Sequence, residues 1–219
     1  MTQWKRENDF DAIINPVALK YNIEPAFLKA VIAQESRFNP AASRSEPQLH
    51  DASAGLMQIL YSTAKDKGYR GTFGSPADLT GLFDPAINVE FGARYLRDCL
   101  ARTSAHANAA SMYNGGYRPN LGFGERATRQ VTICLARDSN KKCIKSRTVL
   151  PGEFANQEYV FNVLANYAYF KALEPGTVPP PPVSGGAGPV PGVYFRPSPL
   201  GTLLLGALAL FMSVRRRLT

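Results

Sequence analysis

The sequence predicts a mainly α-helical domain with a small β-hairpin insert, followed by a linker and a C-terminal hydrophobic helix. Three observations lead to this prediction. Apolar residues recur at helical spacing in several segments before residue 174. Residues 117–151 instead alternate apolar and polar side chains, which is typical of β-strands. Prolines and glycines then dominate residues 175–199, and a run without charge follows at 200–214.

The composition suits one globular domain, residues 1–174, with a tail. The chain has 219 residues, a formal net charge of +8 and a sequence pI near 9.5. Such a basic balance favours an acidic partner, and since no nucleic-acid motif is present we expect an anionic envelope polymer rather than nucleic acid. The three cysteines show neither CxxC nor Cys/His ligand spacing, so we expect no metal site and no cofactor.

Two helices are predicted at residues 7–21 and 25–36. The first places its apolar residues toward the core, and Pro16 should break or restart it. These apolar residues are Phe10, Ile13, Ile14, Val17 and Leu19. Pro25 is well placed at a first helical position, and Asn39-Pro40 should end the second helix.

The middle of the chain predicts a polar loop at 40–53 and a helix at 54–67, capped by Asp51 or Ser53 and stopped by Gly68. A Gly/Pro-rich connection covers 70–85. Further helices are expected at 86–101, at 108–113 and, after the insert, at 158–170.

The insert at 117–151 is rich in positive charge, with eight basic and two acidic residues. Val131, Ile133 and Leu135 alternate with polar residues before a turn-like segment at 137–141, which indicates a β-hairpin. Cys134 and Cys143 lie nine residues apart across this hairpin. They could form a disulfide if the domain acts in an oxidising compartment.

The C-terminal end predicts membrane attachment. Residues 200–214 carry no charge, and Arg215, Arg216 and Arg217 follow within the basic tail 215–219. Since positive charge is retained on the cytoplasmic side, the segment should anchor the chain with its domain on the other side of the membrane. Its 15 residues are short of the ~20 that usually span a bilayer, so it could instead lie in the interface.

Glu35 is the anomaly of the second predicted helix. It follows an apolar stripe of Phe27, Leu28, Val31 and Ile32. Burial and the negative end of the helix dipole both raise the pKa of a carboxyl group. A carboxylic acid that stays protonated near neutral pH can act as general acid toward a glycosidic oxygen. The plainer interpretation is a solvated glutamate near a helix end.

Several short motifs occur in an order that resembles the soluble lytic transglycosylase family, peptidoglycan-cleaving enzymes with a lysozyme-like fold. They are Glu35-Ser36, Phe38-Asn39-Pro40, the segment 55–59 (GLMQI), the segment 113–116 (YNGG) and Tyr159-Val160. The resemblance implies cleavage of the MurNAc–GlcNAc β-1,4 bond with formation of 1,6-anhydroMurNAc. One glutamate, Glu35, would act first as acid and then as base.

The resemblance also implies substrate-binding roles, each with a structural alternative. Ser36 would help fix the geometry near Glu35, or simply bond the backbone at a helix end. Met57 and Gln58 would line the sugar groove, although the apolar neighbours of Met57 favour a core position.

The remaining residues implied by the resemblance come from later in the chain. Tyr113 and Asn114 would lie beside the cleft, or Asn114 would only belong to a helix-ending turn. The Tyr159 hydroxyl would approach Glu35, or Tyr159 would be a core aromatic residue. The sequence departs from the family pattern at Leu60, Tyr61 and Ala155-Asn156.

Other functions remain open at this point. A muramidase of the same fold would cleave the same bond with water, and a wall-binding virion component would not cleave at all. We therefore expect peptidoglycan strands as the partner, on the periplasmic side of a membrane or in a phage virion or envelope assembly.

Overall fold

The computed structural model describes residues 4–69 and 80–174. The predicted linker, hydrophobic segment and basic tail, together residues 175–219, lie outside the described residues, as does most of the 70–85 connection. Within the described ranges, no helix is both long enough and apolar enough to cross a membrane.

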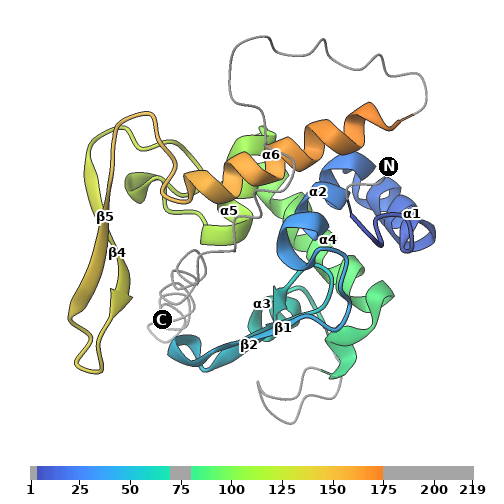
Figure 1. Ribbon diagram of the computed structural model, residues 1–219, viewed down its shortest axis with the longest axis horizontal. Coiled ribbons are helices and arrows are strands. Elements are labelled where there is room, and N and C mark those ends of the chain that lie inside the picture. The colour runs from blue at the N-terminus through green and yellow to red at the C-terminus, as the bar shows by residue number, and fades with distance from the viewer. Residues whose placement is uncertain (1–3, 70–79, 175–219) are drawn as a thin grey trace, which may run out of the picture.

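The described chain is mainly helical, with two small antiparallel sheets (Figure 1). Its α-helices are α1 (Asp11–Tyr21), α2 (Pro25–Ser36), α3 (Tyr61–Asp66), α4 (Pro85–Thr103), α5 (His106–Gly115) and α6 (Gln157–Ala172). Short 3-10 turns are η1 (Pro47–Leu49), η2 (Thr80–Phe83) and η3 (Pro119–Leu121). The strands are β1 (Ser43–Glu46), β2 (Asp51–Ala54), β3 (Ile59–Leu60), β4 (Val131–Arg137) and β5 (Cys143–Val149).

Helix α2 is the centre of the core, and its bounds match the prediction. Eight of its residues are buried, and α6 packs along it (Figure 1). Edge-to-face ring pairs join the two elements: Phe27 with Tyr167, and Phe38, just after α2, with Phe170. These pairs hold α2 and the residues just after it against the C-terminal half of α6.

The first helix differs from the prediction at its start and at Pro16. It begins at Asp11 and continues through Pro16 without a break. Pro16 and Ala12 are both exposed, so the carbonyl of Ala12 that loses a helical donor faces solvent and can bond water. Leu19 was expected in the core but is 84% exposed.

The predicted polar loop at 40–53 and the first half of the predicted helix at 54–67 are wrong. This segment instead forms a three-stranded antiparallel sheet in the order β1-β2-β3, and only its end is helical, as α3. Ser43 pairs with Ala54, and Ser53 pairs with Leu60. The expected capping of a helix at Ala54 is therefore wrong as well; from β2, the Asp51 carboxylate instead accepts hydrogen bonds from the Ser62 backbone N–H and hydroxyl in the first turn of α3.

A buried asparagine explains why residues 54–58 are not helical. Asn88 of α4 donates to the carbonyls of Ala54 and Leu82 and accepts from the Met57 N–H at 2.7 Å. These bonds hold a turn in which Gly55 has a φ of +76°. A tertiary partner 31 residues from Met57 therefore overrides the local helical pattern.

The second half of the chain follows the prediction more closely. Helices α4, α5 and α6 appear where they were expected, each somewhat longer than predicted. The hairpin is formed by β4 and β5, with Val131 opposite Val149. A disulfide joins Cys134 to Cys143, whose Cα atoms lie 5.8 Å apart, while Cys99 is buried and unpaired.

Candidate active site

Glu35 lies in the last turn of α2, with its side chain partly accessible to solvent. The surrounding protein removes water from the carboxyl group and raises its pKa from 4.5 to about 7. The hydrogen bond from Tyr159 and the positive charge of Arg44 oppose this rise without cancelling it. Glu35 is thus a carboxylic acid that can hold a proton near neutral pH and still release it.

Tyr159, in the first turn of α6, holds one oxygen of this carboxyl group. Its hydroxyl donates to Glu35 Oε1 at 2.6 Å. Burial, followed by the nearby Glu35 charge, raises the pKa of Tyr159 well above its usual value, so it remains a neutral donor. No described residue donates to Glu35 Oε2, which leaves that oxygen for a substrate.

Tyr113 connects α5 to the turn that precedes β3. It is 6% exposed, and its hydroxyl donates to the Met57 carbonyl at 2.9 Å. Met57 itself is fully buried, and its sulfur fills the space beside Gly92 where a Cβ would otherwise lie. Both side chains therefore stabilise the backbone of the turn before β3. The burial of Met57 favours the core position for its side chain.

Gln58 is held by the backbone around it. Its amide nitrogen donates to the carbonyls of Ala42 and Gly55, and its amide oxygen accepts from the Ser53 hydroxyl at 3.3 Å. Its φ of +43° is unusual for a residue other than glycine. These bonds fix the end of β2 beside the turn, which is a structural task.

Asn114 belongs to a network of polar side chains between α5 and the N-terminus of α6. Its Oδ1 accepts from Asn156 Nδ2 at 2.9 Å, and the same nitrogen donates to the Ser111 carbonyl. The Ser111 hydroxyl donates back to Asn156 at 2.7 Å. The Nδ2 of Asn114 donates to none of the described residues, so it is available to an acceptor on a ligand.

Ser36, next to the acid, makes the local bond expected of a hydroxyl near a helix end. It is 9% exposed, and its Oγ donates to the Ile32 carbonyl at 3.3 Å. The structure thus brings Glu35 and Tyr159 into direct contact, and it arranges Tyr113, Met57, Gln58 and Asn114 as their support. Among the residues that the structure describes, no group of three or more His, Cys, Asp or Glu side chains is arranged to hold a metal ion.

A known protein family matches this chain. The family model for the transglycosylase SLT domain matches residues 12–130, which is more than half of the chain. The chain belongs to the transglycosylase SLT domain family. This match includes α2 and the site residues up to Asn114, and it ends before the hairpin and α6.

Two relatives of this SLT domain are named as lytic murein transglycosylases. It is 32% identical over 123 residues to membrane-bound lytic murein transglycosylase C of Photorhabdus laumondii, and 35% identical over the same length to its counterpart in Shigella sonnei. Each match covers 51% of this chain and 32% of the relative, so the chain spans about a third of their length. An inactive mutant of the lytic transglycosylase Slt of Pseudomonas aeruginosa has a similar fold, with a TM-score of 0.53 and 20% identity over 81% of this chain and 26% of that chain.

The SLT domain also contains site residues that the sequence did not reveal. Arg44 of β1 is the cation that acts on the Glu35 carboxyl, and its Nε lies 3.1 Å from Glu46 Oε1. Glu46 is 7% exposed and lies opposite Asp51 in the sheet. Burial raises its pKa, the Arg44 charge lowers it, and the Asp51 charge raises it. Because β1 was expected to be a loop, nothing indicated that Arg44 lies near Glu35.

Two asparagines were also missed, because their hydrogen-bond partners are distant in the sequence. Asn88 is fully buried within α4, between apolar residues, and Asn156 stands at a departure from the family pattern. A buried amide inside an apolar stripe is a signal in principle, because such a group needs hydrogen-bond partners. The partners of Asn88, however, come from two other segments, the turn at 54–57 and Leu82, and only the fold brings these to Asn88.

Proposed function

We propose that this chain is a peptidoglycan lytic transglycosylase that cleaves the MurNAc–GlcNAc β-1,4 bond and leaves a 1,6-anhydroMurNAc end. The observation that carries the proposal is the state of Glu35. Its carboxyl group has a pKa of about 7, is held at Oε1 by Tyr159 and keeps Oε2 free of described donors. Membership of the SLT family supports the same reaction.

In the first step Glu35 acts as general acid. The protonated carboxyl gives its proton to the glycosidic oxygen of the departing GlcNAc while the bond from that oxygen to C1 of MurNAc breaks. The Tyr159 hydroxyl then stabilises the new carboxylate through its hydrogen bond. Arg44 contributes positive charge as the negative charge develops.

In the second step the same carboxylate acts as general base. It removes the proton from the C6 hydroxyl of MurNAc, and O6 bonds to C1 to close the anhydro ring. Glu35 is then protonated again, so one group completes the cycle without a water molecule. A pKa of about 7 suits both halves, because neither protonation state is strongly disfavoured.

Substrate positioning is assigned to the α5 side of the site. Asn114 accepts from Asn156 and keeps an amide donor available, which fits an acetamido carbonyl of the sugar. Ser36, Met57, Gln58 and Tyr113 hold the surrounding backbone, as their hydrogen bonds and burial suggest.

The test is the Glu35→Gln variant on purified peptidoglycan. An amide cannot donate and recover the proton, so release of soluble muropeptides should fall by at least ~10²-fold. The matched control is Glu158→Gln, the same change at an exposed residue next to Tyr159, which should leave the rate unchanged. Undiminished release by folded Glu35→Gln protein would remove Glu35 from the mechanism.

Mass spectrometry of the released sugars tests the reaction itself. The proposal requires anhydro ends and no new reducing ends. If the hydrated sugar is the sole product, the chain is a muramidase that uses the same acid.

Membrane attachment is a further part of the proposal. The two bacterial relatives are named membrane-bound enzymes, and the uncharged segment 200–214, outside the described residues, would supply the attachment here. The domain would then work on the wall-facing side. A role in a phage virion stays a prediction of the sequence alone.

A further inference from the structure

We propose that the hairpin β4–β5 is a basic arm that binds the free carboxylates of the peptide stems on peptidoglycan, outside the catalytic site. This inference rests on the proposed function, because that function supplies the polymer. It concerns binding by a part of the chain that the SLT family match at 12–130 does not include.

The charge of the hairpin is the first argument. Between residues 131 and 149 there are five basic side chains and one acidic side chain. Lys141, Lys142 and Lys145 are exposed, and no carboxylate of a described residue pairs with them. In the helical body, by contrast, lysines commonly have acidic partners, such as Lys20 with Glu90 and Lys67 with Asp98. The unneutralised charge on the hairpin therefore favours an external anion.

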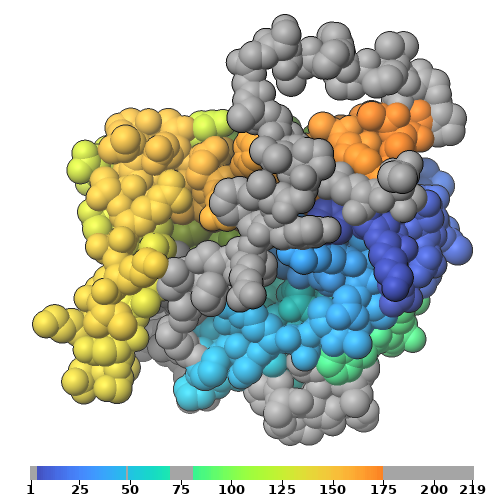
Figure 2. Space-filling view, in the orientation of Figure 1, coloured from blue at the N-terminus to red at the C-terminus, as the bar shows by residue number. Residues whose placement is uncertain are grey.

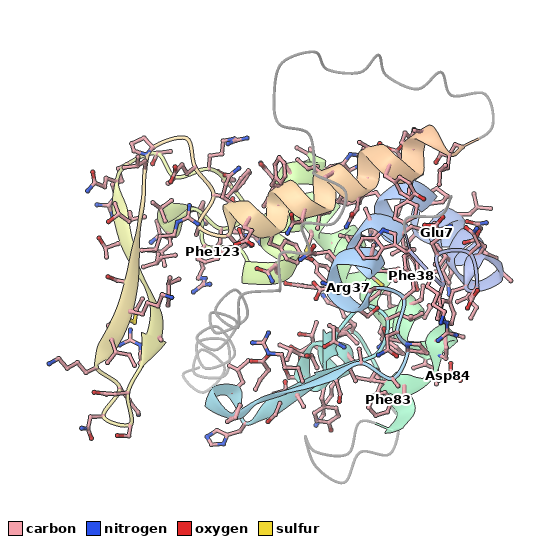
Figure 3. The ribbon with its side chains drawn as sticks, in the orientation of Figure 1. Glu7, Arg37, Phe38, Phe83, Asp84 and Phe123 are labelled. Atoms are coloured by element: carbon pink, nitrogen blue, oxygen red, sulfur yellow. A yellow bond between two sulfur atoms is a disulfide. The ribbon has the colours of Figure 1, made fainter. Side chains whose placement is uncertain are left out.

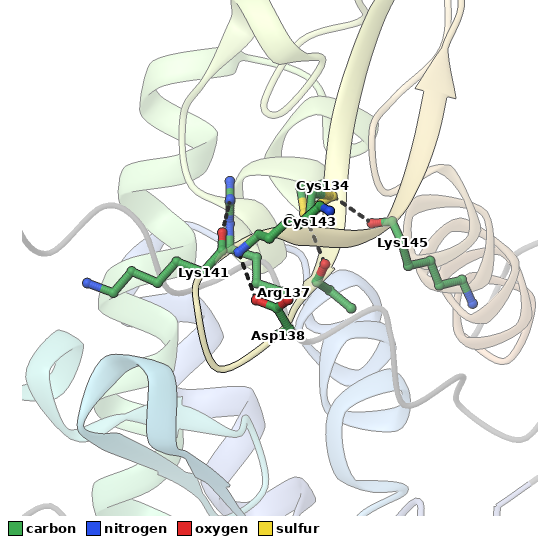
Figure 4. Close-up of a disulfide and its surroundings, with 8 residues drawn as sticks. Cys134, Arg137, Asp138, Lys141, Cys143 and Lys145 are labelled. Carbon is green, nitrogen blue, oxygen red and sulfur yellow. Dashed lines mark hydrogen bonds between the residues drawn. A yellow bond between two sulfur atoms is a disulfide. The ribbon is translucent and has the colours of Figure 1, made fainter.

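The shape of the hairpin indicates the kind of anion. The hairpin extends away from the helical body at the left of Figure 2. In Figure 4 the side chains of Lys141 and Lys145 point to opposite sides of the strands. Cations on both sides of a projecting arm cannot enclose one small ligand, but they suit a polymer with spaced negative charges.

The composition of the arm favours a carboxylate polymer over nucleic acid or lipid. Residues 131–149 contain no aromatic side chain on which bases could stack. Insertion into a lipid surface needs an apolar face, and the arm has a single large exposed apolar side chain, Ile144, which is 65% exposed and lies near the tip. Peptide stems with free carboxylates need only positive charge at a suitable spacing.

The tip of the arm is organised before any ligand binds. The disulfide between Cys134 and Cys143 closes it, and Asp138 accepts hydrogen bonds from the backbone N–H groups of Asn140 and Lys142, both at 2.9 Å (Figure 4). A preorganised arm loses little conformational entropy on binding.

The foot of the arm is joined to the catalytic helices. Phe123 packs on Gly115 of α5 so closely that a Cβ there would lie 2.0 Å from its ring (Figure 3). Arg147 of β5 donates to the Ala155 carbonyl, four residues before Tyr159. A peptidoglycan strand bound by the arm is therefore held at a fixed position relative to Glu35.

The experiment compares binding of full-length chains to purified sacculi, with Glu35→Gln in every chain to prevent cleavage. The test chain also carries Lys141→Gln, Lys142→Gln and Lys145→Gln. The control chain carries the same charge change at exposed cations elsewhere, Lys5→Gln, Lys65→Gln and Arg97→Gln. We expect the test chain to bind about tenfold more weakly at low salt, and the control chain to bind as the parent does.

A second substrate identifies the anion. Sacculi whose carboxylates have been converted to amides should bind all three chains equally. Equal binding of test and control chains to untreated sacculi would overturn the proposal. So would a tenfold difference that persists on amidated sacculi or is reproduced with single-stranded DNA or anionic vesicles. Failure of the proposed function would appear separately, as absence of anhydro products from wild-type protein.

Discussion

The sheet β1-β2-β3 and the hairpin β4–β5 differ in burial and charge: the sheet has a buried central strand and two buried carboxylates, whereas the hairpin is largely exposed and basic. All four residues of β2 are buried, while the first four residues of β5 are exposed. The sheet contains Glu46 and Asp51 below 9% exposure, and the hairpin carries its lysines in solvent. The first region shapes the environment of the acid, and the second extends away from it.

The two regions are also stabilised in different ways. The sheet depends on distant partners: Asn88 for the Gly55 turn and Ser62 for Asp51. The hairpin depends on its own pairing, its disulfide and a small apolar cluster at its foot. A change in the sheet should therefore affect the whole domain, while a change at the hairpin should stay local.

Two glycine substitutions test this difference most strongly. Gly55 and Gly152 both have positive φ, +76° and +87°. A Cβ on Gly55 would lie 2.3 Å from Asn88 Nδ2 and 2.4 Å from the Leu82 carbonyl, whereas a Cβ on Gly152 would meet nothing within 4 Å. Gly55→Ala should lower the free energy of unfolding by at least about 3 kcal/mol, because backbone strain and a clash add together. Gly152→Ala should cost about 1 kcal/mol, from strain alone.

Urea unfolding of both variants measures the two losses in free energy of unfolding. If Gly55→Ala costs no more than Gly152→Ala, the sheet is not held by Asn88 as described. The expected loss of lytic activity with Gly55→Ala but not with Gly152→Ala is a second readout.

Removal of one positive charge from each region should have a smaller effect on the protein than the glycine substitutions, and it should be seen in the pH profile of kcat/KM. Arg44 lowers the pKa of Glu35, so Arg44→Gln should raise that pKa and move the alkaline decline of kcat/KM to higher pH. Lys145→Gln should leave the profile unchanged on a short glycan without peptide stems. Arg44→Lys is the control, because it keeps the charge beside Glu46 and should keep the profile near that of wild type.

This comparison would fail if both substitutions moved the profile equally. The electrostatic influence on Glu35 would then come from overall charge rather than from the position of Arg44. A fall in kcat/KM at low pH of less than about tenfold is expected for Arg44→Gln, since Glu35 retains its proton there.

The same contrast explains what the sequence could predict. Pro25 and Asn39-Pro40 set the ends of α2, and alternating apolar residues indicated the hairpin, because both signals act through neighbours in the chain. The segment 54–58 has apolar residues suited to a helix, yet Asn88 holds it as a turn. Strand β1, with the sequence SRSE, has no apolar alternation at all.

The site residues also fall into those that the sequence indicated and those whose roles depend on distant contacts. The apolar stripe singled out Glu35, and the family resemblance implied both its catalytic role and the approach of the Tyr159 hydroxyl. Arg44 and Asn156 could not be predicted, because their roles depend on contacts across the fold. The resemblance implied that Met57 and Gln58 line the sugar groove, which stays a prediction, whereas their bonds and burial show that they hold the local backbone.

The pKa of Glu35 is the most direct test of the account. It can be measured by following the side-chain carboxyl resonances of ¹³C-labelled glutamates against pH, with Glu35→Gln protein used to assign the signal. We predict a midpoint at about 7, with kcat/KM constant below that pH and falling above it as the acid form is lost. A midpoint near the ordinary value of 4.5 would show that burial does not keep this carboxyl protonated and would contradict its role as the catalytic acid.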